Sequence, residues 1–481
     1  MPARLQFDFN PHPRPQPREP DRPLRILLLG DFSGQSAVER VPLAQRRTHK
    51  LDLDSVDGVM QRLQPRLQLG GGDAGPASDI VLDSLDSFHP DSLVATLPLF
   101  AALRQTRQQL QDPRRFAEAA AMLVAPPAAA PAPPPSPAGA DLLAGLLGGR
   151  PAVADTAAPA PVAGVMDSFI RAVIAPHVVP DQAAQQAALL RSVDDAIAAE
   201  MRRILHAPAF QALESAWRGV HWLITALELD ENLELHLFDV SRDELLADIV
   251  AAHGRLTATG LHKALADRWR NVPGGESWSV LAGLYSFGPS DTDIGLLAAL
   301  GLLACQAGGP LLAAGDPALA GADPAQLVGW QTLRHSEAAP WIGLSAPRIL
   351  LRRPYGQRSD PLEAFDFEEF PAEPVHEHLL WGPGSLATAL LIGRAFSAKG
   401  WAMEPGDERE IADLPVYSFM RDGQSQLQAC AEQFLSDSSL QALLDAGLMP
   451  LASHRHRNAV TVVRMQSIAD PAQALAGFHA S

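Results

Sequence analysis

The chain is short of positive charge, and this shortage excludes one class of function. Its 481 residues include 38 Lys and Arg against 55 Asp and Glu, which gives a net charge of −17. Binding to nucleic acid without sequence preference needs a basic surface, and so does binding to anionic lipid. We therefore expect no nucleic-acid partner and no attachment to a membrane surface.

Cysteines and long apolar runs are also scarce. The two cysteines, Cys305 and Cys430, are too few for a disulfide scaffold. Both lie in runs that read as apolar helices, which predicts buried side chains and no redox pair. The longest apolar run covers residues 294–305 and is too short to span a bilayer, and the first residues contain no apolar signal-peptide core. These absences predict a soluble, cytoplasmic protein without membrane insertion.

Proline, by contrast, is abundant and divides the chain. In residues 1–23 it recurs at nearly every second position of one stretch, which predicts an extended arm. Residues 125–163 interleave proline with alanine, which is typical of a semi-rigid linker. Within this linker, residues 141–149 (DLLAGLLGG) form an apolar patch, either a transient helix or a docking motif. The division predicts two folded regions, at residues 24–124 and 164–481.

Apolar periodicity indicates mixed α/β structure on both sides of the linker. Residues 26–29 form a continuous apolar run closed by Gly30, which predicts a buried strand. Helical periodicity over 190–206 is followed by an alternating strand at 233–240 and a capping box from Ser241 to Glu244. Strand and helix patterns then alternate to the end of the chain. We predict a mixed α/β fold with two domains, each with a central sheet flanked by helices.

No motif in the sequence predicts catalysis or a cofactor. The segment GDFSGQS follows a strand, but it lacks the lysine and the glycine spacing of a phosphate-binding loop. The His-x-His pairs at 376–378 and 454–456 do not have the helical spacing of zinc ligands, so we predict surface histidines. Arg348, Arg352 and Arg353 are expected to flank a strand, or to pair across an interface. We predict no catalytic residue, no cofactor and no metal.

Several long segments resemble the sheath proteins of bacterial type VI secretion systems. RPLRILLLGDFSG (22–34), LDSFHPDSL (85–93) and LRQTRQQLQDPRRF (103–116) resemble the small sheath subunit, which is TssB-like. RRILHAPAFQALESAWRGVHWLI (202–224) resembles the large, TssC-like subunit. So do APWIGLSAPRILLRRPYG (339–356), HLLWGPGSLATALLIGRAF (378–396) and the closing segment LDAGLMPLASHRHRNAVTVVRMQSIADP (444–471). The resemblance implies that both sheath subunits are fused in one chain.

This resemblance implies a structural role and a set of partners. Sheath subunits of that family polymerise into a helical tube around an inner tube of Hcp-like protein and contract to propel it. The implied partners are further copies of the chain, the inner tube, baseplate components and a recycling AAA+ ATPase of the ClpV type. Strands exchanged between neighbours are expected around Leu5, Phe7 and Phe9, and at Val460, Val462 and Val463. The candidate ATPase-docking helix carries Met166, Phe169, Ile170 and Val173, for which ordinary packing is the alternative.

Two alternatives to a sheath subunit stay open from the sequence. Both halves are shorter than typical free subunits, which favours a sheath-like paralogue that does not polymerise and acts as a baseplate or assembly factor. The second alternative is an α/β enzyme or a nucleotide-binding protein. A rise in melting temperature on addition of nucleotide would distinguish this last class, because a ligand of the native state stabilises it.

Overall fold

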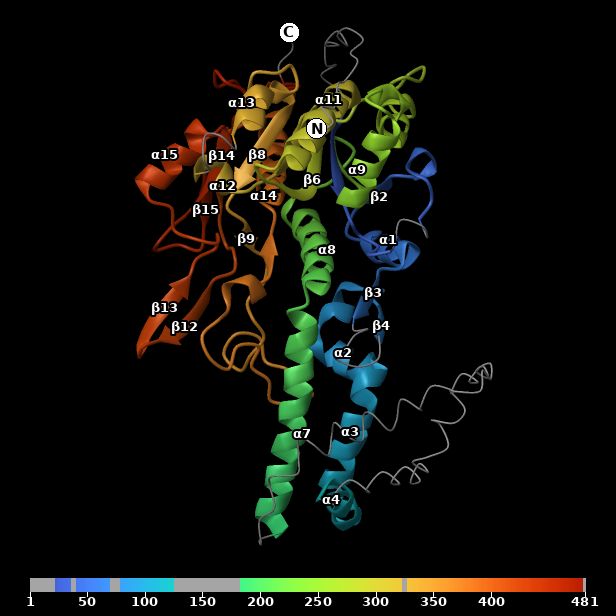
Figure 1. The fold of residues 1–481 in the computed structure, drawn as a ribbon, viewed down its shortest axis with the longest axis vertical. Helices are drawn as coiled ribbons and strands as arrows, with labels where there is room; N and C mark the ends of the chain where they lie inside the picture. The colour runs from blue at the N-terminus through green and yellow to red at the C-terminus, as the bar shows by residue number, and fades with distance from the viewer. Residues whose placement is uncertain (1–21, 36–39, 70–77, 125–181, 322–326, 479–481) are drawn as a thin grey trace, which may run out of the picture.

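The computed structural model describes residues 22–35, 40–69, 78–124, 182–321 and 327–478. Its centre is a sheet of nine strands (Figure 1). From one edge to the other, the strands are β11 (Glu410–Ile411), β15 (Val460–Val462), β14 (Leu448–Ser453), β8 (Ile342–Ala346), β7 (Leu311–Gly315), β6 (Val280–Phe287), β1 (Leu24–Gly30), β5 (Leu233–Asp239) and β2 (His49–Leu51). The six strands from β14 to β5 are parallel, and the three outermost strands run antiparallel to their neighbours.

One sheet therefore replaces the central sheet that we predicted for each half. Strand β1 precedes the linker, yet it pairs in parallel with β5 on one side and β6 on the other, both of which follow the linker. All seven residues of β1 are buried. A strand that is covered on both faces has a continuous apolar sequence, as β1 has. Such a sequence does not indicate which strands pair with it. The mixed α/β class is confirmed, and the two halves share its main sheet.

Helices cover both faces of the sheet. One face packs Leu24, Ile26 and Leu28 of β1 against α8 (Pro208–Ala226) and α14 (Gly384–Lys399). The opposite face packs Leu27 and Leu29 against another set of helices. That set comprises α9 (Arg242–Ala251), α11 (Asp291–Ala307), α13 (Val328–Arg334) and α15 (Asp437–Asp445). The helix predicted over 190–206 is confirmed as α7 (Gln182–Leu205), and α8 follows it.

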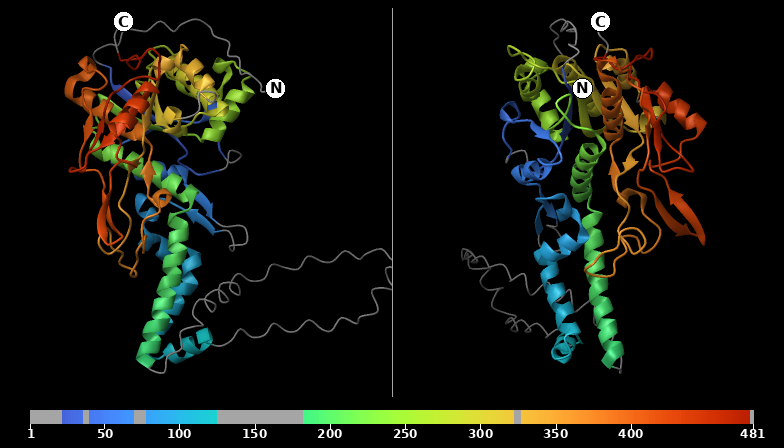
Figure 2. Two further views of the ribbon diagram at one scale, coloured as in Figure 1. Left: turned by 60° about the vertical axis from the view of Figure 1, so that its left-hand side comes forward. Right: turned by 180° about the vertical axis from the view of Figure 1, so that it is seen from behind.

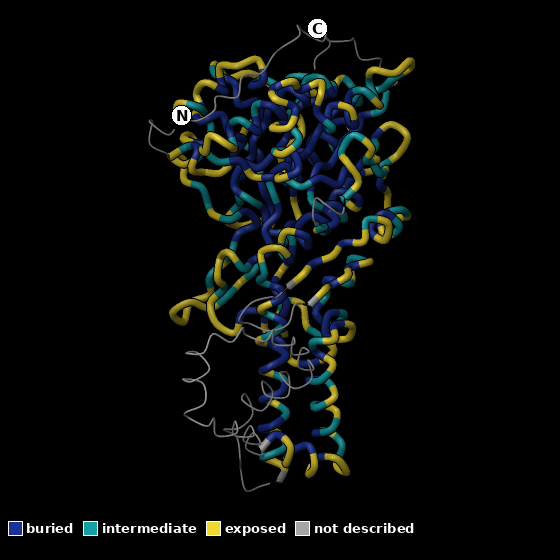
Figure 3. Tube along the Cα trace, turned by 45° about the vertical axis from the view of Figure 1, so that its right-hand side comes forward, coloured by how far each residue is buried: buried dark blue, intermediate teal, exposed yellow. Residues whose placement is uncertain are grey.

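A helical stalk extends from this body (Figures 1 and 2). It contains α7 together with α2 (Pro90–Thr96), α3 (Pro98–Gln111) and α4 (Phe116–Val124). Arg107 of α3 pairs with Asp194 of α7 at 2.7 Å, and the Gln186 amide donates to the Leu110 carbonyl at 2.6 Å. In Figure 3 the buried residues lie inside the body and between the stalk helices.

Short strands and helices complete the described fold. Helix α1 (Val56–Leu63) leads to the hairpin of β3 (Arg66–Leu69) and β4 (Ser78–Val81). Strands β9 (Ile349–Leu350) and β10 (Trp381–Gly382) pair beneath the body, and β12 (Tyr417–Arg421) and β13 (Gln424–Gln428) form a second hairpin. Two helices of three and four residues are α10 (Gly260–His262) and α12 (Ala318–Gly321). Cys430 is buried, as predicted, whereas Cys305 is only partly buried. Cys430 follows β13 in a loop, so its predicted helix is wrong.

Cutting the linker should leave the two halves together. The described chain stops at the end of α4 and resumes at α7, and these two helices meet in the stalk. The two halves contact each other in the stalk and through β1 in the sheet. The linker therefore raises their effective concentration but is not needed for these contacts. With a protease site placed within residues 125–163, both fragments should co-elute from gel filtration after cleavage. Separation of the fragments under native conditions would contradict a shared sheet.

Candidate functional site

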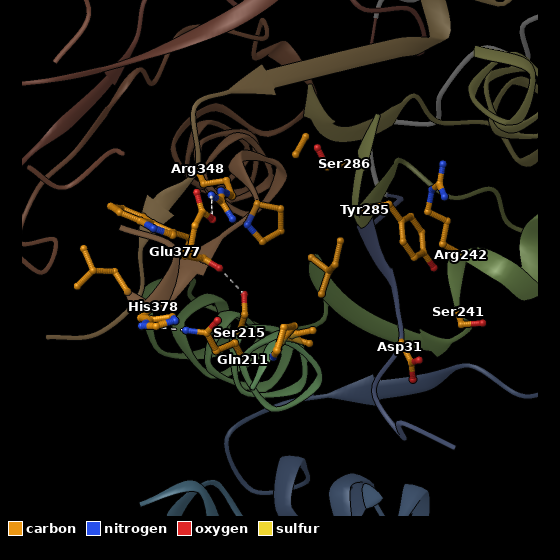
Figure 4. A pocket seen from close by; sticks show the side chains of 18 of the residues that line it. Asp31, Gln211, Ser215, Ser241, Arg242, Tyr285, Ser286, Arg348, Glu377 and His378 are labelled. Carbon is orange, nitrogen blue, oxygen red and sulfur yellow. Dashed lines mark hydrogen bonds and ion pairs between the residues drawn. The ribbon is translucent and has the colours of Figure 1, made fainter. Parts of the chain in front are cut away.

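A cleft lies where the parallel strands end (Figure 4). Its volume is about 680 Å³, and its walls include Asp31 after β1, Ser241 after β5 and Ser286 within β6. Ligands of open α/β sheets bind at this edge, near the point where the strand order reverses. Here the strand order reverses at β1, because β5 and β6 lie on opposite sides of it. The cleft lies beside this point. The position favours a binding site, and the side chains determine what it can do.

One wall of the cleft includes aromatic and amide side chains beside Arg348 and Glu377 (Figure 4). The rings of His206 and His378 stack with centroids 4.1 Å apart. Gln211 donates to the His378 carbonyl at 2.9 Å, and the Ser215 hydroxyl donates to the Trp381 carbonyl at 2.9 Å. Burial and the neighbouring His206 lower the pKa of His378. In the part of the chain that the structure describes, neither imidazole of this wall is hydrogen-bonded to a serine hydroxyl, so the wall holds no preformed nucleophile and base.

Several charged and polar groups of the opposite wall already have partners. Arg242 pairs with Asp293, and the Tyr285 hydroxyl donates to the Val240 carbonyl at 2.6 Å. The capping box at Ser241 is confirmed, since its hydroxyl accepts the Glu244 amide of α9. Burial raises the pKa of Asp31 above its ordinary value, although the Arg40 guanidinium acts in the opposite direction. These interactions stabilise the fold, and they occupy the polar groups that a ligand would otherwise bind.

The same network joins the two halves of the chain. Arg40, whose side chain is 2% exposed, pairs with Asp31 of its own half and with Glu244 of the other at 2.6 Å. Arg46 also reaches Glu244, at 2.8 Å. Asp239, at the end of β5, accepts the Ser33 hydroxyl at 2.8 Å. Buried charges need such partners, so this edge of the sheet depends on residues from both sides of the linker.

A second buried network lies at the junction of the stalk and the body. Arg352, 8% exposed, donates to Glu214 of α8 at 2.8 Å and to Glu369 at 2.8 Å. The two carboxylates are 0% and 1% exposed. Arg218 pairs with the same Glu214 at 2.7 Å, and its guanidinium also donates to the Tyr355 hydroxyl. Arg352 follows β9, as expected of a residue that flanks a strand. Its side chain lies in the interior, where it ties the loop after β9 to α8.

Acid should destabilise the protein through Glu369. Burial alone would raise the pKa of this carboxyl, but the Arg352 guanidinium, the nearby His206 imidazole and a hydrogen bond from the Tyr355 amide lower it to about 2, from an ordinary 4.5. A depressed pKa stabilises the fold above pH 4.5, and this stability is lost as the pH falls from 4.5 towards 2. The shift corresponds to ~3 kcal/mol. We expect the free energy of unfolding, measured by urea denaturation from pH 6 to 3, to fall by less in Glu369→Gln than in the unchanged chain.

The histidine pairs of the sequence do not converge on a metal. His376 bonds Glu432 at 3.1 Å, whereas His378 stacks on His206. His454 bonds the Thr461 hydroxyl at 2.8 Å. Within the described ranges, no group of three or more His, Cys, Asp or Glu side chains is arranged to hold a metal ion. In the same ranges, every helix falls short of the length and apolarity that crossing a membrane requires.

The structure describes only part of the predicted assembly sites. Leu5, Phe7 and Phe9 lie outside the described residues, as do Met166, Phe169, Ile170, Val173 and the patch at 141–149. Val460 and Val462 are buried in β15, between β14 and β11 of the same chain. The Val463 amide donates to the Pro450 carbonyl at 3.0 Å. Exchange of this strand between subunits stays a prediction, and it would require these pairings to open.

Comparison with known proteins gives matches on both sides of the linker. Residues 187–469 match the family described as VipB: EvpB/VC_A0108, tail sheath N-terminal domain. Residues 1–122 match a second family, described as type VI secretion system, VipA, VC_A0107 or Hcp2. A curated relative, the type VI secretion system sheath protein TssC1 of Pseudomonas aeruginosa, is 30% identical over 308 residues. That alignment covers 59% of this chain and 61% of the relative's length.

Proposed function

Because the chain belongs to the VipB tail sheath family, we propose that it is a structural subunit of the contractile sheath of a type VI secretion system. The supporting observation is the shared sheet. Strand β1, from the segment that matches the VipA family, fills the gap between β5 and β6, which belong to the VipB match. A small and a large sheath half thus form one folded unit in a single chain.

The proposed role is mechanical rather than catalytic. Both matched families are sheath components, and the two arginines that line the cleft are paired, Arg242 with Asp293 and Arg348 with Glu432. We propose that copies of the chain bind head to tail, since an unclosed heterologous contact generates a helical filament. An Hcp-like inner tube, baseplate components and a ClpV-type ATPase are the proposed partners, and the cytoplasm is the proposed location.

Electron microscopy of the purified chain tests the proposal. Negative staining should show long, hollow, ridged cylinders when the chain is mixed with its cognate inner-tube protein. The pitch of these cylinders would report whether they are extended or contracted. Discrete particles, both alone and with the inner-tube protein, would overturn the polymeric role and favour the baseplate or assembly-factor alternative.

A further inference from the structure

The hairpin of β12 and β13 projects from the body beside the stalk (Figure 1). Its register runs from Tyr417 opposite Gln428 to Arg421 opposite Gln424. Asp422 and Gly423 form the turn, both with positive φ, which is typical of a two-residue hairpin loop. A two-stranded hairpin is marginally stable by itself in water, so a further strand would stabilise it.

The two sides of this hairpin differ. On the β12 side, Arg421 pairs with Glu373 at 2.8 Å, and Tyr417 lies against Phe370. Both contacts come from the loop that precedes β10. Strand β13 lies on the outside, and apart from its ladder with β12 no backbone hydrogen bond of residues 424–428 occurs in the described structure.

The outer edge of β13 lacks the features that protect edge strands. Proteins protect such edges with short strands, charges or proline. The main sheet follows this rule, since its edge strands β2 and β11 have three and two residues and β2 carries Lys50. Strand β13 has five residues, Gln-Ser-Gln-Leu-Gln, with no charge and no proline. Such an uncharged edge is suited to pairing with another strand.

The position of the turn determines which groups the edge offers. In a two-residue hairpin, the residues that flank the loop are hydrogen-bonded to each other, and hydrogen-bonded pairs then alternate along the ladder. Gln424, Gln426 and Gln428 therefore direct their backbone groups to β12. Ser425 and Leu427 direct theirs outward, away from the hairpin.

We propose that β13 pairs with β13 of a second copy of this chain, antiparallel and about a two-fold axis at Gln426. This register places Ser425 opposite Leu427 of the other copy, so both outward N–H groups and both outward carbonyls are matched. The edge is complementary to itself, which is the requirement of an isologous contact. Its neutrality matters because two copies that each carry a net charge of −17 repel wherever charged surfaces meet.

Side chains on the solvent face support the same occupant. Met420 and Leu427 are 56% and 42% exposed and lie on one face of the hairpin, diagonally across the ladder. In the paired sheet, Leu427 of one copy lies opposite Ser425 of the other. The two Leu427 side chains are then diagonal neighbours across the pair of strands. In the four-stranded sheet, Met420 and Leu427 of both copies form one apolar strip. In a single hairpin these side chains are exposed to water.

A cysteine crosslink tests this register directly. Gln426 faces Gln426 of the second copy as a non-hydrogen-bonded pair, with Cα atoms about 4.5 Å apart, which suits a disulfide. Gln426→Cys should therefore form a covalent dimer under mild oxidation. The native thiols give little background, because burial raises the pKa of both Cys305 and Cys430 to about 11.

Gln424→Cys is the matched control. It changes the same residue type on the same face of β13, but its counterpart in the second copy lies about 13 Å away along the strand. We expect Gln426→Cys to crosslink at least tenfold faster than Gln424→Cys, and a mixture of Gln424→Cys with Gln428→Cys to crosslink as well. Equal rates at 424 and 426, or no dimer of Gln426→Cys, would overturn the proposal. The pairing is independent of the sheath role: an isologous contact about a two-fold axis does not build a head-to-tail filament, so the crosslink is scored on free particles.

Discussion

Replacing Leu28 by aspartate should prevent both halves of the chain from folding. Leu28 is 0% exposed in β1, opposite Leu237 of β5 and Ala282 of β6. Removing a buried leucine side chain costs about 2–5 kcal/mol, and an unpaired charge in its place costs more. This loss approaches the whole stability of a typical domain, about 5–15 kcal/mol. We expect the variant to be insoluble, or to lose hydrogen-exchange protection in β5 and β6 as well as in β1.

Leu53→Asp provides the control for this substitution. Leu53 belongs to the same half and is 64% exposed, so the same chemical change should leave melting and solubility nearly unaltered. If Leu28→Asp left residues 182–481 folded and protected, β1 would not be an integral strand of the sheet. In that case the two halves would be separate domains, as the sequence suggested.

The sequence predicted the elements of this sheet better than their arrangement. The run at residues 26–29 predicted a buried strand, and alternation predicted β5, because both patterns depend on local periodicity. Neither pattern says that β1 lies between two strands more than 200 residues away. Pairing of that kind depends on which surfaces fit together over the whole fold.

Some local predictions also failed, for identifiable reasons. The run around Cys430 has helical periodicity, yet the backbone forms β13 and then a loop. There the Ala431 amide donates to the Ser453 hydroxyl at 2.8 Å and the Leu350 amide to the Cys430 carbonyl at 2.7 Å. Tertiary hydrogen bonds overrode a local preference at this point.

The buried networks were only half visible in the sequence. Arg352 attracted notice as one of three nearby arginines, but its partners Glu214 and Glu369 lie 138 and 17 residues away. Arg40, which links the halves, gave no signal, since an arginine in a loop usually lies in solvent. Carboxylates are common in an acidic chain, so nothing local marks the ones that become buried.

Arg352→Met should destabilise the protein by about 3–5 kcal/mol, since it leaves two buried carboxylates without their shared cation. The methionine side chain retains much of the apolar volume of the arginine. The loss of stability therefore reflects the missing charge more than lost packing. Arg352→Lys should recover only part of the stability, because an ammonium cannot reproduce the fork that reaches Glu214 and Glu369 at once. The stabilities of the unchanged chain, Arg352→Met and Arg352→Lys are compared by their midpoints of urea unfolding.

Neutralising the partners distinguishes charge from volume. If uncompensated carboxylates cause the loss, Glu369→Gln should cost less in the Arg352→Met background than in the unchanged chain, and the double-mutant cycle gives the difference. The matched surface pair is Arg457 with Glu410, whose side chains are 57% and 42% exposed, and Arg457→Met should cost less than about 1 kcal/mol. Equal costs at Arg352 and Arg457 would mean that the interior pair does not hold the loop after β9 against α8. The junction of stalk and body would then depend on apolar packing alone.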